Sequence, residues 1–443
     1  MRIQLSDYFH YGRLFRFTLP SIVMMIFTSI YSIVDGFFVS NYVGKSPFAA
    51  VNFVMPLLMI LGAVGFMFGA GGSALIAKTM GEGKREKAQK LFSLFVWAAA
   101  VCGVVIGAAG LALIRPVCAF LGAEGEMLDH CTVYGRVLLL ALPFYMLQFE
   151  FQSFFIAAEK PQIGLAMTVV SGVANMVLDA LFIAVFSWGL VGAAAATALS
   201  QLLGGAAALI YFARPNTSAL RLTKTEMDRK ALVRACINGS SELMSNVSMS
   251  LVGMLYNVQL MKYAGEDGVA AYGVIMYINM IFLSAFIGYS NGIAPVVSFH
   301  YGAQNLDELK SLFKKSLVII AAFSISMFAL GEVLSRPLSA VFVSYDAALL
   351  SMTIRAFMIY SVSFLLSGIA IFGSAFFTAL NDGLTSAIIS FLRTLVFQTA
   401  AVMLMPLLWG LDGIWYSVIA AEAMAVLVTA IFLIAYRRKY EYY

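Results

Sequence analysis

The pentapeptide WGLVG at Trp188–Gly192 returns as WGLDG at Trp409–Gly413, 221 residues later. The offset is about half of the 443-residue chain. We therefore expect two structurally equivalent halves that arose by internal duplication. The same offset pairs further identical residues: Ala49 and Ala50 with Ala270 and Ala271, Met55 with Met276, Met59 with Met280, Gly71 with Gly292, Gly81 with Gly302, and Leu91 and Phe92 with Leu312 and Phe313.

Composition places the chain in a lipid bilayer. Hydrophobic residues make up 61% of it and charged residues 12%, with a mean hydropathy of +0.90, and a soluble domain needs more charge to cover its surface. The net charge of +5 is spread over short loops, so we expect no nucleic-acid partner. The four cysteines lack CxxC spacing and the three histidines lie far apart, which argues against a zinc site or a disulfide framework. The first apolar run is too long for a signal peptide and ends without a cleavage pattern, so no cleavable signal is expected.

Twelve apolar runs are long enough to cross a bilayer about 30 Å thick at about 1.5 Å per residue. They fall near residues 14–42, 49–79, 91–114, 131–158, 162–186, 190–213, 231–262, 270–301, 312–334, 352–380, 384–408 and 412–436. We predict an all-α integral membrane protein with 12 transmembrane helices in two pseudo-symmetric six-helix lobes. The N-lobe spans 1–213, a cytoplasmic linker 214–230 and the C-lobe 231–443.

The second helix of each half is followed by a similar polar loop, starting at Gly81 and Gly302. We expect each loop to be a glycine C-cap followed by a short amphipathic helix on the membrane surface. With both termini and the loops after the second, fourth, sixth, eighth and tenth helices on one side, that side holds 21 of the 28 Lys and Arg residues, which predicts cytoplasmic termini. Six helices per half make the two repeats parallel, and duplications of this kind are typical of secondary transporters.

Asp35 is the strongest candidate for chemistry. A carboxyl group in mid-membrane costs about 2.5–3.5 kcal/mol to insert, so its presence indicates a function. Asp35 lies deep in the first span, has no basic neighbour in sequence, and follows Tyr31 by one helical turn. Burial disfavours the charged form, which suits a group that binds and releases a proton. The alternative is a hydrated aspartate near the helix end.

Asp179 is the second candidate. Asn175 precedes it by four residues, so the two side chains share one face of the fifth helix. Two oxygen-bearing groups on one apolar helix can build half of a cation site or a proton network. The alternative is a hydrogen-bonded clamp between helices with no part in transport.

Glu150 and Gln152 point to different faces of the fourth helix. Gln152 is a candidate to join the network of the fifth helix. Glu150 could serve transport, or it could form a structural ion pair with an intramembrane arginine, for which Arg393 and Arg136 are available.

Two further acids have open roles. Glu242 is either a second coupling carboxylate facing the central cavity or a residue at the start of the seventh helix near the interface. Glu422 aligns with Gln201 by the offset of 221, and we interpret both as polar contacts between helices.

The two halves diverge at the acidic positions. The offset places Tyr256 opposite Asp35, and the run Phe391–Leu404 has no acid to match Asp179. A coupling site is therefore expected in the N-lobe alone.

Methionine and phenylalanine are abundant, with 24 and 36 copies. Thioethers and rings adapt to varied apolar shapes and attract cations weakly, which fits a permissive cavity for lipophilic cations. We place Met55, Met59, Met276 and Met280 nearest that cavity, and Pro20 is a point at which the first helix can bend. The alternative is that these are ordinary core and lipid-facing residues.

The chain resembles the multidrug and toxic compound extrusion (MATE) family over essentially its full length, and most of all its bacterial MepA-like and DinF-like branch. The resemblance is specific in combination. The features on which it rests are the two six-helix lobes, Pro20…Tyr31…Asp35-Gly36, Gly81-Glu82-Gly83, Asn175…Asp179 and Thr197.

The resemblance implies a MATE-type fold and an antiporter of the cytoplasmic membrane that exports cationic, lipophilic compounds by alternating access in exchange for H⁺ or Na⁺. It implies a monomer surrounded by membrane lipids, with no enzymatic activity, no resident cofactor and no firm metal site. The implied cation site, which would also hold Na⁺, consists of Asp35, Asn175, Asp179 and Thr197, with Tyr31 and Gln152 beside it. Asp35, Glu242 and the four methionines would contact substrate, and Pro20 would allow bending.

Two alternatives remain at this point. Flippases for lipid-linked oligosaccharides are distantly similar to this family, but they would favour an arginine-rich cavity for pyrophosphate, and Arg393 is the only arginine expected in mid-span. A channel or a non-transporting membrane protein would not require buried acids in one half of a duplicated fold.

Overall fold

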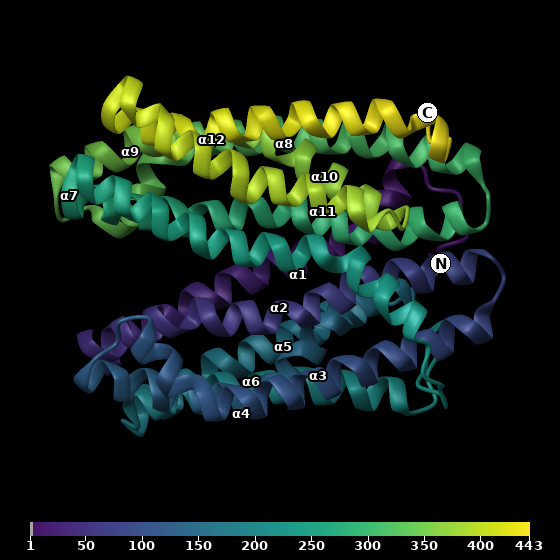
Figure 1. Ribbon diagram of the computed structural model, residues 1–443, viewed down its shortest axis with the longest axis horizontal. Helices are drawn as coiled ribbons and strands as arrows, with labels where there is room; N and C mark the ends of the chain where they lie inside the picture. The colour runs from purple at the N-terminus through teal and green to yellow at the C-terminus, as the bar shows by residue number, and fades with distance from the viewer. Residues whose placement is uncertain (1–2) are drawn as a thin grey trace.

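The computed structural model describes residues 3–443, apart from the side chain of Lys45, and its described part is helical (Figure 1). Segments labelled η are π-helical. The N-lobe contains α1 (Tyr11–Phe38), η1 (Val39–Val43), α2 (Lys45–Gly81), α3 (Arg85–Phe120), α4 (Gly125–Ala157), α5 (Pro161–Asp179), η2 (Ala180–Val185) and α6 (Gly189–Ala213). The C-lobe contains α7 (Arg229–Gly302), α8 (Leu306–Val343), α9 (Ala347–Ser361), α10 (Phe364–Ala379), α11 (Gly383–Phe391), η3 (Leu392–Val396) and α12 (Phe397–Tyr440).

These helices make twelve crossings in the described chain. Nine helical runs are long and apolar enough to cross a membrane, and the pair α9 and α10, bent by 48°, makes a tenth. Two of the nine each hold two crossings, because Gly265 in α7 and Gly410 in α12 break the helix with φ of 64° and 59°. The predicted fold class is confirmed, and most helices extend a few residues beyond their predicted ranges.

The repeated WG pentapeptide is explained by backbone geometry. Gly189 has φ of 60° and Gly410 has φ of 59°, in the left-handed region that favours glycine. Both glycines turn the chain between the last two crossings of their lobe. Trp188 and Trp409 are both about half exposed, at 52% and 54%. The motif therefore recurs because each half needs the same reversal.

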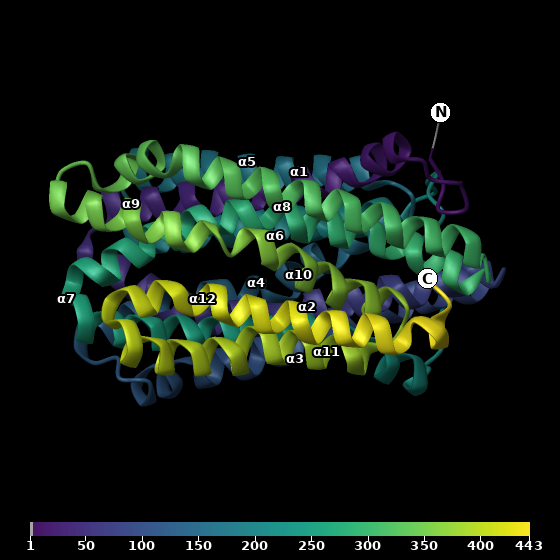
Figure 2. The same cartoon turned by 90° about the horizontal axis from the view of Figure 1, so that it is seen from above.

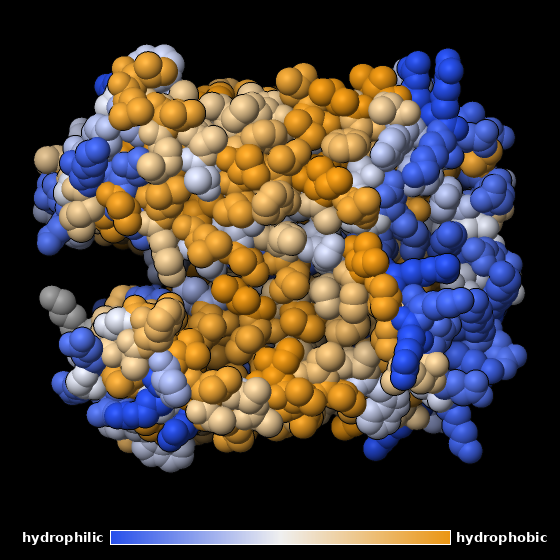
Figure 3. All heavy atoms as spheres, in the orientation of Figure 1, coloured by the Kyte–Doolittle hydropathy of each residue, from blue (hydrophilic) through white to orange (hydrophobic). Residues whose placement is uncertain are grey.

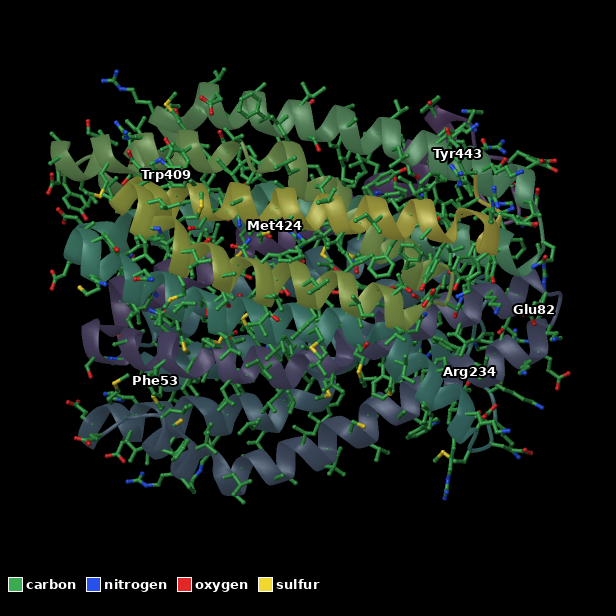
Figure 4. All side chains as sticks on the ribbon, turned by 45° about the horizontal axis from the view of Figure 1, so that its top comes forward. Phe53, Glu82, Arg234, Trp409, Met424 and Tyr443 are labelled. Atoms are coloured by element: carbon green, nitrogen blue, oxygen red, sulfur yellow. The ribbon has the colours of Figure 1, made fainter. Side chains whose placement is uncertain are left out.

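The helices form two bundles separated by a cleft at one end. In Figure 1, α2–α6 lie on one side and α8–α12 on the other, with α1 and α7 between them, and Figure 2, seen from above, shows the C-lobe helices in front of those of the N-lobe. Figure 3 shows the cleft at the left end, opposite a strongly hydrophilic end. Both termini lie at that hydrophilic end, which we call the terminal end, and we call the opposite one the cleft end. Figure 4 places Glu82, Arg234 and Tyr443 at the terminal end and Phe53 and Trp409 at the cleft end.

The hydrophobic core follows the same division. One cluster of buried residues joins both lobes, including Phe92 and Phe154 from the N-lobe and Phe286 and Phe313 from the C-lobe. Two other clusters are confined to one lobe each. The lobes thus share a core toward the terminal end and have separate cores toward the cleft end. This arrangement allows the two bundles to move relative to each other without unpacking either one.

The loops after α2 and α7 correct one prediction. The loop after α2 has the expected glycine C-cap at Gly83, with φ of 80°, whereas after α7 this position is taken by Gln304, with φ of 57°. Gly81 and Gly302 are the last residues of their helices. The expected surface helices are the first turns of α3 and α8. Gly81 and Gly302 are required for another reason, which is close approach. A Cβ atom on Gly81 would overlap the carbonyl oxygen of Phe299, and one on Gly302 would overlap that of Lys78. We call this contact the glycine seam.

The N-terminal segment lies across the terminal end and bonds to both lobes. The Leu5 amide donates to Glu159 Oε1 at 2.9 Å, between α4 and α5. The Phe9 amide donates to Glu308 Oε1 at 2.8 Å, at the start of α8, and the Phe9 carbonyl accepts from Lys315. Leu5 and Phe9 are buried, at 0% and 1% exposure. The segment therefore closes the terminal end together with the glycine seam.

The C-lobe contains a buried ion pair. Arg393 donates to both carboxylate oxygens of Glu422, at 3.0 and 2.9 Å. Glu422 therefore links two helices, as predicted. The alternative pairing of Glu150 with Arg393 is wrong, because that guanidinium faces Glu422. Glu150 is fully buried, and neither of its carboxyl oxygens has a hydrogen-bond partner within the described residues, so it pairs with neither Arg393 nor Arg136.

Replacement of Arg393 by alanine is expected to lower the stability by about 3–5 kcal/mol, because it leaves the Glu422 charge buried and unpaired. Replacing both residues together, with Arg393→Met and Glu422→Leu, should restore most of the loss. Thermal unfolding of the purified protein in detergent measures both effects. Equal losses in the single and the double variant would contradict this interpretation.

Candidate functional site

Two carboxyl groups from distant helices meet inside the N-lobe. Asp35 comes from α1 and Asp179 is the last residue of α5, and the two groups interact electrostatically. Asp179 is fully buried, with no hydrogen-bond partner of ordinary geometry for either oxygen among the described residues. The Thr197 hydroxyl of α6 lies 3.5 Å from Asp35 Oδ1. The sequence predicted these three residues as one site, and the structure brings them together. Asp35 lies eight residues before the end of η1, about 12 Å from the cleft end.

Two tyrosines and an amide surround the pair. Tyr31 interacts with Asp35 along α1. Tyr134 of α4 is fully buried and lies within electrostatic range of both carboxyl groups, and its hydroxyl donates to the Met55 sulfur at 3.7 Å. Asn175 is 2% exposed, and its amide nitrogen has no acceptor among the described residues. These neighbours are polar but carry no positive charge that could neutralise the pair.

Sequence reasoning missed Tyr134. The available signal was a tyrosine within an apolar helix, since a buried tyrosine hydroxyl normally has a hydrogen-bond partner. Its position opposite α1 and α5 could not be read from the sequence, because nothing in the pattern of α4 shows which face meets those helices.

Both carboxylates adjoin π-helical turns. η1 begins four residues after Asp35, and η2 begins at the residue after Asp179. The two π segments pack against each other. Such turns are rare and are frequent at functional sites, because the extra residue in the turn alters the direction of side chains and weakens the regular backbone bonding. The site is therefore built where two helices have the least regular backbone.

The other predicted residues lie apart from the pair. Gln152 is five residues from the end of α4, about 8 Å from the terminal end. Glu242 is inside α7, thirteen residues after Arg229, so it does not begin that helix; its side chain is partly exposed. Pro20 is buried within α1, about four turns before Asp35.

The four methionines occupy different settings. Met59 and Met280 are 44% and 37% exposed. Met55 packs against the N-lobe cluster and Met276 against the C-lobe cluster. Met59 and Met280 are therefore exposed, whereas Met55 and Met276 are half-buried.

The C-lobe replaces the acidic pair with neutral and paired groups. Tyr256, opposite Asp35, donates its hydroxyl to Gln398 Oε1 at 2.9 Å, and its ring stacks on Tyr272 at 5.1 Å. The nearest acid, Glu422, is bonded to Arg393. The buried carboxyl groups near the cleft end that lack a basic partner thus belong to the N-lobe site.

This arrangement can bind a monovalent cation or a proton. Two neighbouring carboxyl groups away from water repel each other when both are charged, and a bound cation or proton relieves the repulsion. The described residues contain no group of three or more His, Cys, Asp or Glu side chains that could hold a metal ion. Na⁺ could still use the carboxylate, amide and hydroxyl oxygens of Asp35, Asp179, Asn175 and Thr197, since hard cations prefer oxygen ligands.

Tyr134→Phe removes the hydroxyl group that lies within electrostatic range of both carboxyl groups. We expect it to slow cation-driven transport about fivefold, the effect of losing about 1 kcal/mol of polar stabilisation. The ring remains, so folding should be preserved. The matched control is Tyr272→Phe in the C-lobe, where no unpaired acid is present. Equal slowing in both variants would argue against a specific role for Tyr134.

Known proteins match nearly the whole chain. The MatE family matches residues 20–181 and 243–403. The multidrug export protein MepA of Staphylococcus saprophyticus is 26% identical over 424 residues, covering 95% of this chain and 92% of that protein. MepA of Staphylococcus haemolyticus is 24% identical, covering 98% and 96%.

Solved structures share the fold. A MATE protein in complex with MaL6 superposes with a TM-score of 0.93 at 23% identity, covering 98% of both chains. An outward-facing multidrug resistance MATE family transporter of the MOP superfamily gives 0.92 at 23% identity, covering 97% of this chain and 96% of that one. At this level of identity the similarity establishes the arrangement of helices.

Proposed function

The chain belongs to the MatE family, which matches it in both halves, and from that premise we propose that it is a multidrug efflux antiporter that exports cationic lipophilic compounds in exchange for protons. The family membership expected from the sequence is confirmed. The multidrug export proteins of Staphylococcus, similar over 92–96% of their own length, support the export function.

The observation that carries the proposal is the carboxyl pair of Asp35 and Asp179. It lies in apolar membrane-spanning helices near the cleft end, has no basic partner among the described residues, and has no equivalent in the C-lobe. With the pair charged, the N-lobe attracts a cationic compound. A proton that enters from the cleft removes this attraction, so that the compound leaves as the proton binds.

The same reasoning gives the orientation. The terminal end holds most of the Lys and Arg residues, so we assign it to the cytoplasm and the cleft to the outside of the cytoplasmic membrane. The described conformation is then open outward, and the glycine seam is its inner gate.

Two related proposals are less favoured. Na⁺ could replace the proton at the same oxygen ligands. A lipid-linked oligosaccharide flippase would need free arginines in the cavity for pyrophosphate, whereas Arg393 is bonded to Glu422 at both carboxylate oxygens. We infer transport by a single chain, with no catalytic reaction.

The test uses everted vesicles that contain the protein. Ethidium movement is recorded with an imposed pH gradient and, separately, with an imposed sodium gradient. Movement with the pH gradient alone supports the proposal. Movement with the sodium gradient alone would mean that Na⁺, and not the proton, is the driving ion that binds at the N-lobe site. Absence of movement with either gradient, for several cationic dyes, contradicts drug export.

A further inference from the structure

A column of buried polar side chains runs from the carboxyl pair toward the terminal end. Below Asp179 on α5, Asn175, Ser171 and Thr168 follow at spacings of four, four and three residues, so they share one face. They are 2%, 3% and 3% exposed. The column is eleven residues long, about 16 Å. Burying this many polar side chains on one helix costs free energy unless they form hydrogen bonds.

Helices α4 and α6 supply some of these partners. Gln148 Nε2 donates to Ser171 Oγ at 3.2 Å, and Ser171 Oγ donates to the Ser200 carbonyl at 2.7 Å. Ser200 Oγ donates in turn to the carbonyl of Thr197, at 2.8 Å. The upper part of the column is thus connected to the residue that contacts Asp35.

The lower part of the column contains a cavity. Gln148, Gln152 and Thr168 line it together with Gly164 and Gly204, and it has room for about one water molecule. Gln152 is 5% exposed, yet neither its amide oxygen nor its amide nitrogen has a partner among the described residues. Because buried amides are almost always hydrogen-bonded, the cavity is suited to hold water.

A second small cavity lies on the other side of Gln152. Ser21 of α1 and Asn291 of α7 line it, along with Ser153. Ser21 Oγ is buried and has no partner among the described residues. Since α1 belongs to the N-lobe and this part of α7 to the C-lobe, the column ends at the boundary between the lobes. This is a boundary that must open inward when the transporter reverses.

The C-lobe offers an internal comparison. Glu159 and Asn381 have φ of 61° and 60° in the turns after α4 and α10. These two turns are 222 residues apart. An offset of 222, one more than the offset between the tryptophans, therefore relates α4 and α5 to α10 and α11. Equivalent positions are then Gln152 and Ser374, Gly164 and Ser386, and Thr168 and Ser390.

In the C-lobe the equivalent space is closed by hydroxyl groups. Ser374 Oγ lies 2.9 Å from Ser386 Oγ and 2.8 Å from Ser390 Oγ, and Thr378 Oγ1 lies 2.7 Å from Ser386 Oγ. These side chains satisfy one another without water. At the positions equivalent to Gln152, Gly164 and Thr168, the C-lobe therefore has hydroxyl groups bonded to one another where the N-lobe has an unpaired amide.

We propose that this polar column, together with water in the cavities beside Gln152, is a proton passage from the Asp35–Asp179 pair to the lobe boundary, with Gln152 at its exit. The pair gives its proton to water that enters the column, the proton moves along the column through water and hydroxyl groups, and it leaves at the boundary once that boundary faces the cytoplasm. The pair regains its negative charge and can bind the next cation. The proton thus leaves through the N-lobe, by a route separate from the cleft. This inference rests on the proposed proton coupling.

The test separates proton flux from drug movement in proteoliposomes. Thr168→Val and Gln152→Leu remove polar groups from the passage with little change of shape. We expect pH-driven ethidium antiport to fall about tenfold, the effect of one lost hydrogen bond in the path. Exchange of labelled for unlabelled ethidium without a pH gradient should stay at the wild-type rate, because it needs no proton release. Ser390→Ala, at the position equivalent to Thr168, is the matched control and should leave both rates unchanged.

Equal loss of both activities in the variants, or no loss of either, overturns the passage. If the wild-type protein shows exchange but no pH-driven antiport, the proposed proton coupling fails and the passage fails with it. A second readout concerns water alone. Met167 lines the first cavity, so brief X-ray hydroxyl-radical labelling should oxidise it in the wild type and less in Thr168→Val. Absence of Met167 oxidation with intact proton antiport would show a dry cavity and overturn the passage alone.

Discussion

Asp35→Asn is expected to reduce pH-driven dye efflux to the level of vesicles without the protein. Asparagine has the same shape but carries no charge and exchanges no proton, so the driving ion loses its site and the cationic substrate loses its attraction. Removing an acid from an apolar membrane-spanning helix also lowers the cost of insertion. Expression and thermal stability should therefore be at least as high as in the wild type, and efflux in everted vesicles measures the loss.

Glu150→Gln is the matched control. Glu150 is as fully buried as Asp179 and also lacks a partner among the described residues, but it lies away from the pair. Neutralising it should leave efflux close to the wild-type rate. Wild-type efflux in Asp35→Asn, or equal loss in both variants, would remove Asp35 from the mechanism.

Gly81→Val and Gly302→Val are expected to have the second largest effect. In each case a side chain would overlap a backbone carbonyl oxygen, of Phe299 or of Lys78, and a carbonyl in a helix cannot rotate away. Overpacking typically costs about 1–3 kcal/mol, and here the cost falls on the conformation in which the terminal end is closed. We expect the lobes to separate at that end and transport to be lost. The measurement is the reaction of a cysteine introduced at Ala77, which is buried one helical turn before Gly81, with a membrane-impermeant thiol reagent, which should become faster.

Gly273→Ala is the control for these variants. Gly273 lies in α7, as Gly302 does, and a Cβ atom there would meet nothing within 4 Å. It should leave both transport and thiol reactivity unchanged. Unaltered reactivity in the valine variants would mean that the glycine seam does not gate the terminal end.

The sequence alone predicted the features that depend on its internal repeat and on single charged residues in apolar segments. The offset between Trp188 and Trp409 identified two equivalent halves, and Asp35 and Asp179 stood out because acids are rare in apolar helices. Their meeting with Thr197 followed from the family resemblance. Spacing along one helix shows which residues share a face, but not which face another helix covers.

This limit accounts for what was missed. Tyr134 meets the pair only because α4 packs opposite α1 and α5. Arg393 could have paired with Glu150 by composition alone, yet the fold places Glu422 beside it. Gly81 resembled a helix cap because glycine suits both a left-handed turn and close packing, and only the position of α7 distinguishes the two. Glu332, which accepts from the Ser361 hydroxyl at 2.5 Å beside the bend between α9 and α10, gave no signal of a partner.

The glycine seam also preserves a record of ancestry. Gly81 contacts Phe299 while Gly302 contacts Lys78, and the offset of 221 converts each contact into the other. Such reciprocity defines the isologous interface of a twofold-symmetric homodimer. The seam therefore has the form of a dimer interface between two identical six-helix subunits, retained after gene fusion. After fusion the two halves could diverge in sequence. The N-lobe then kept its unpaired acids, whereas the C-lobe has an acid that is paired with an arginine.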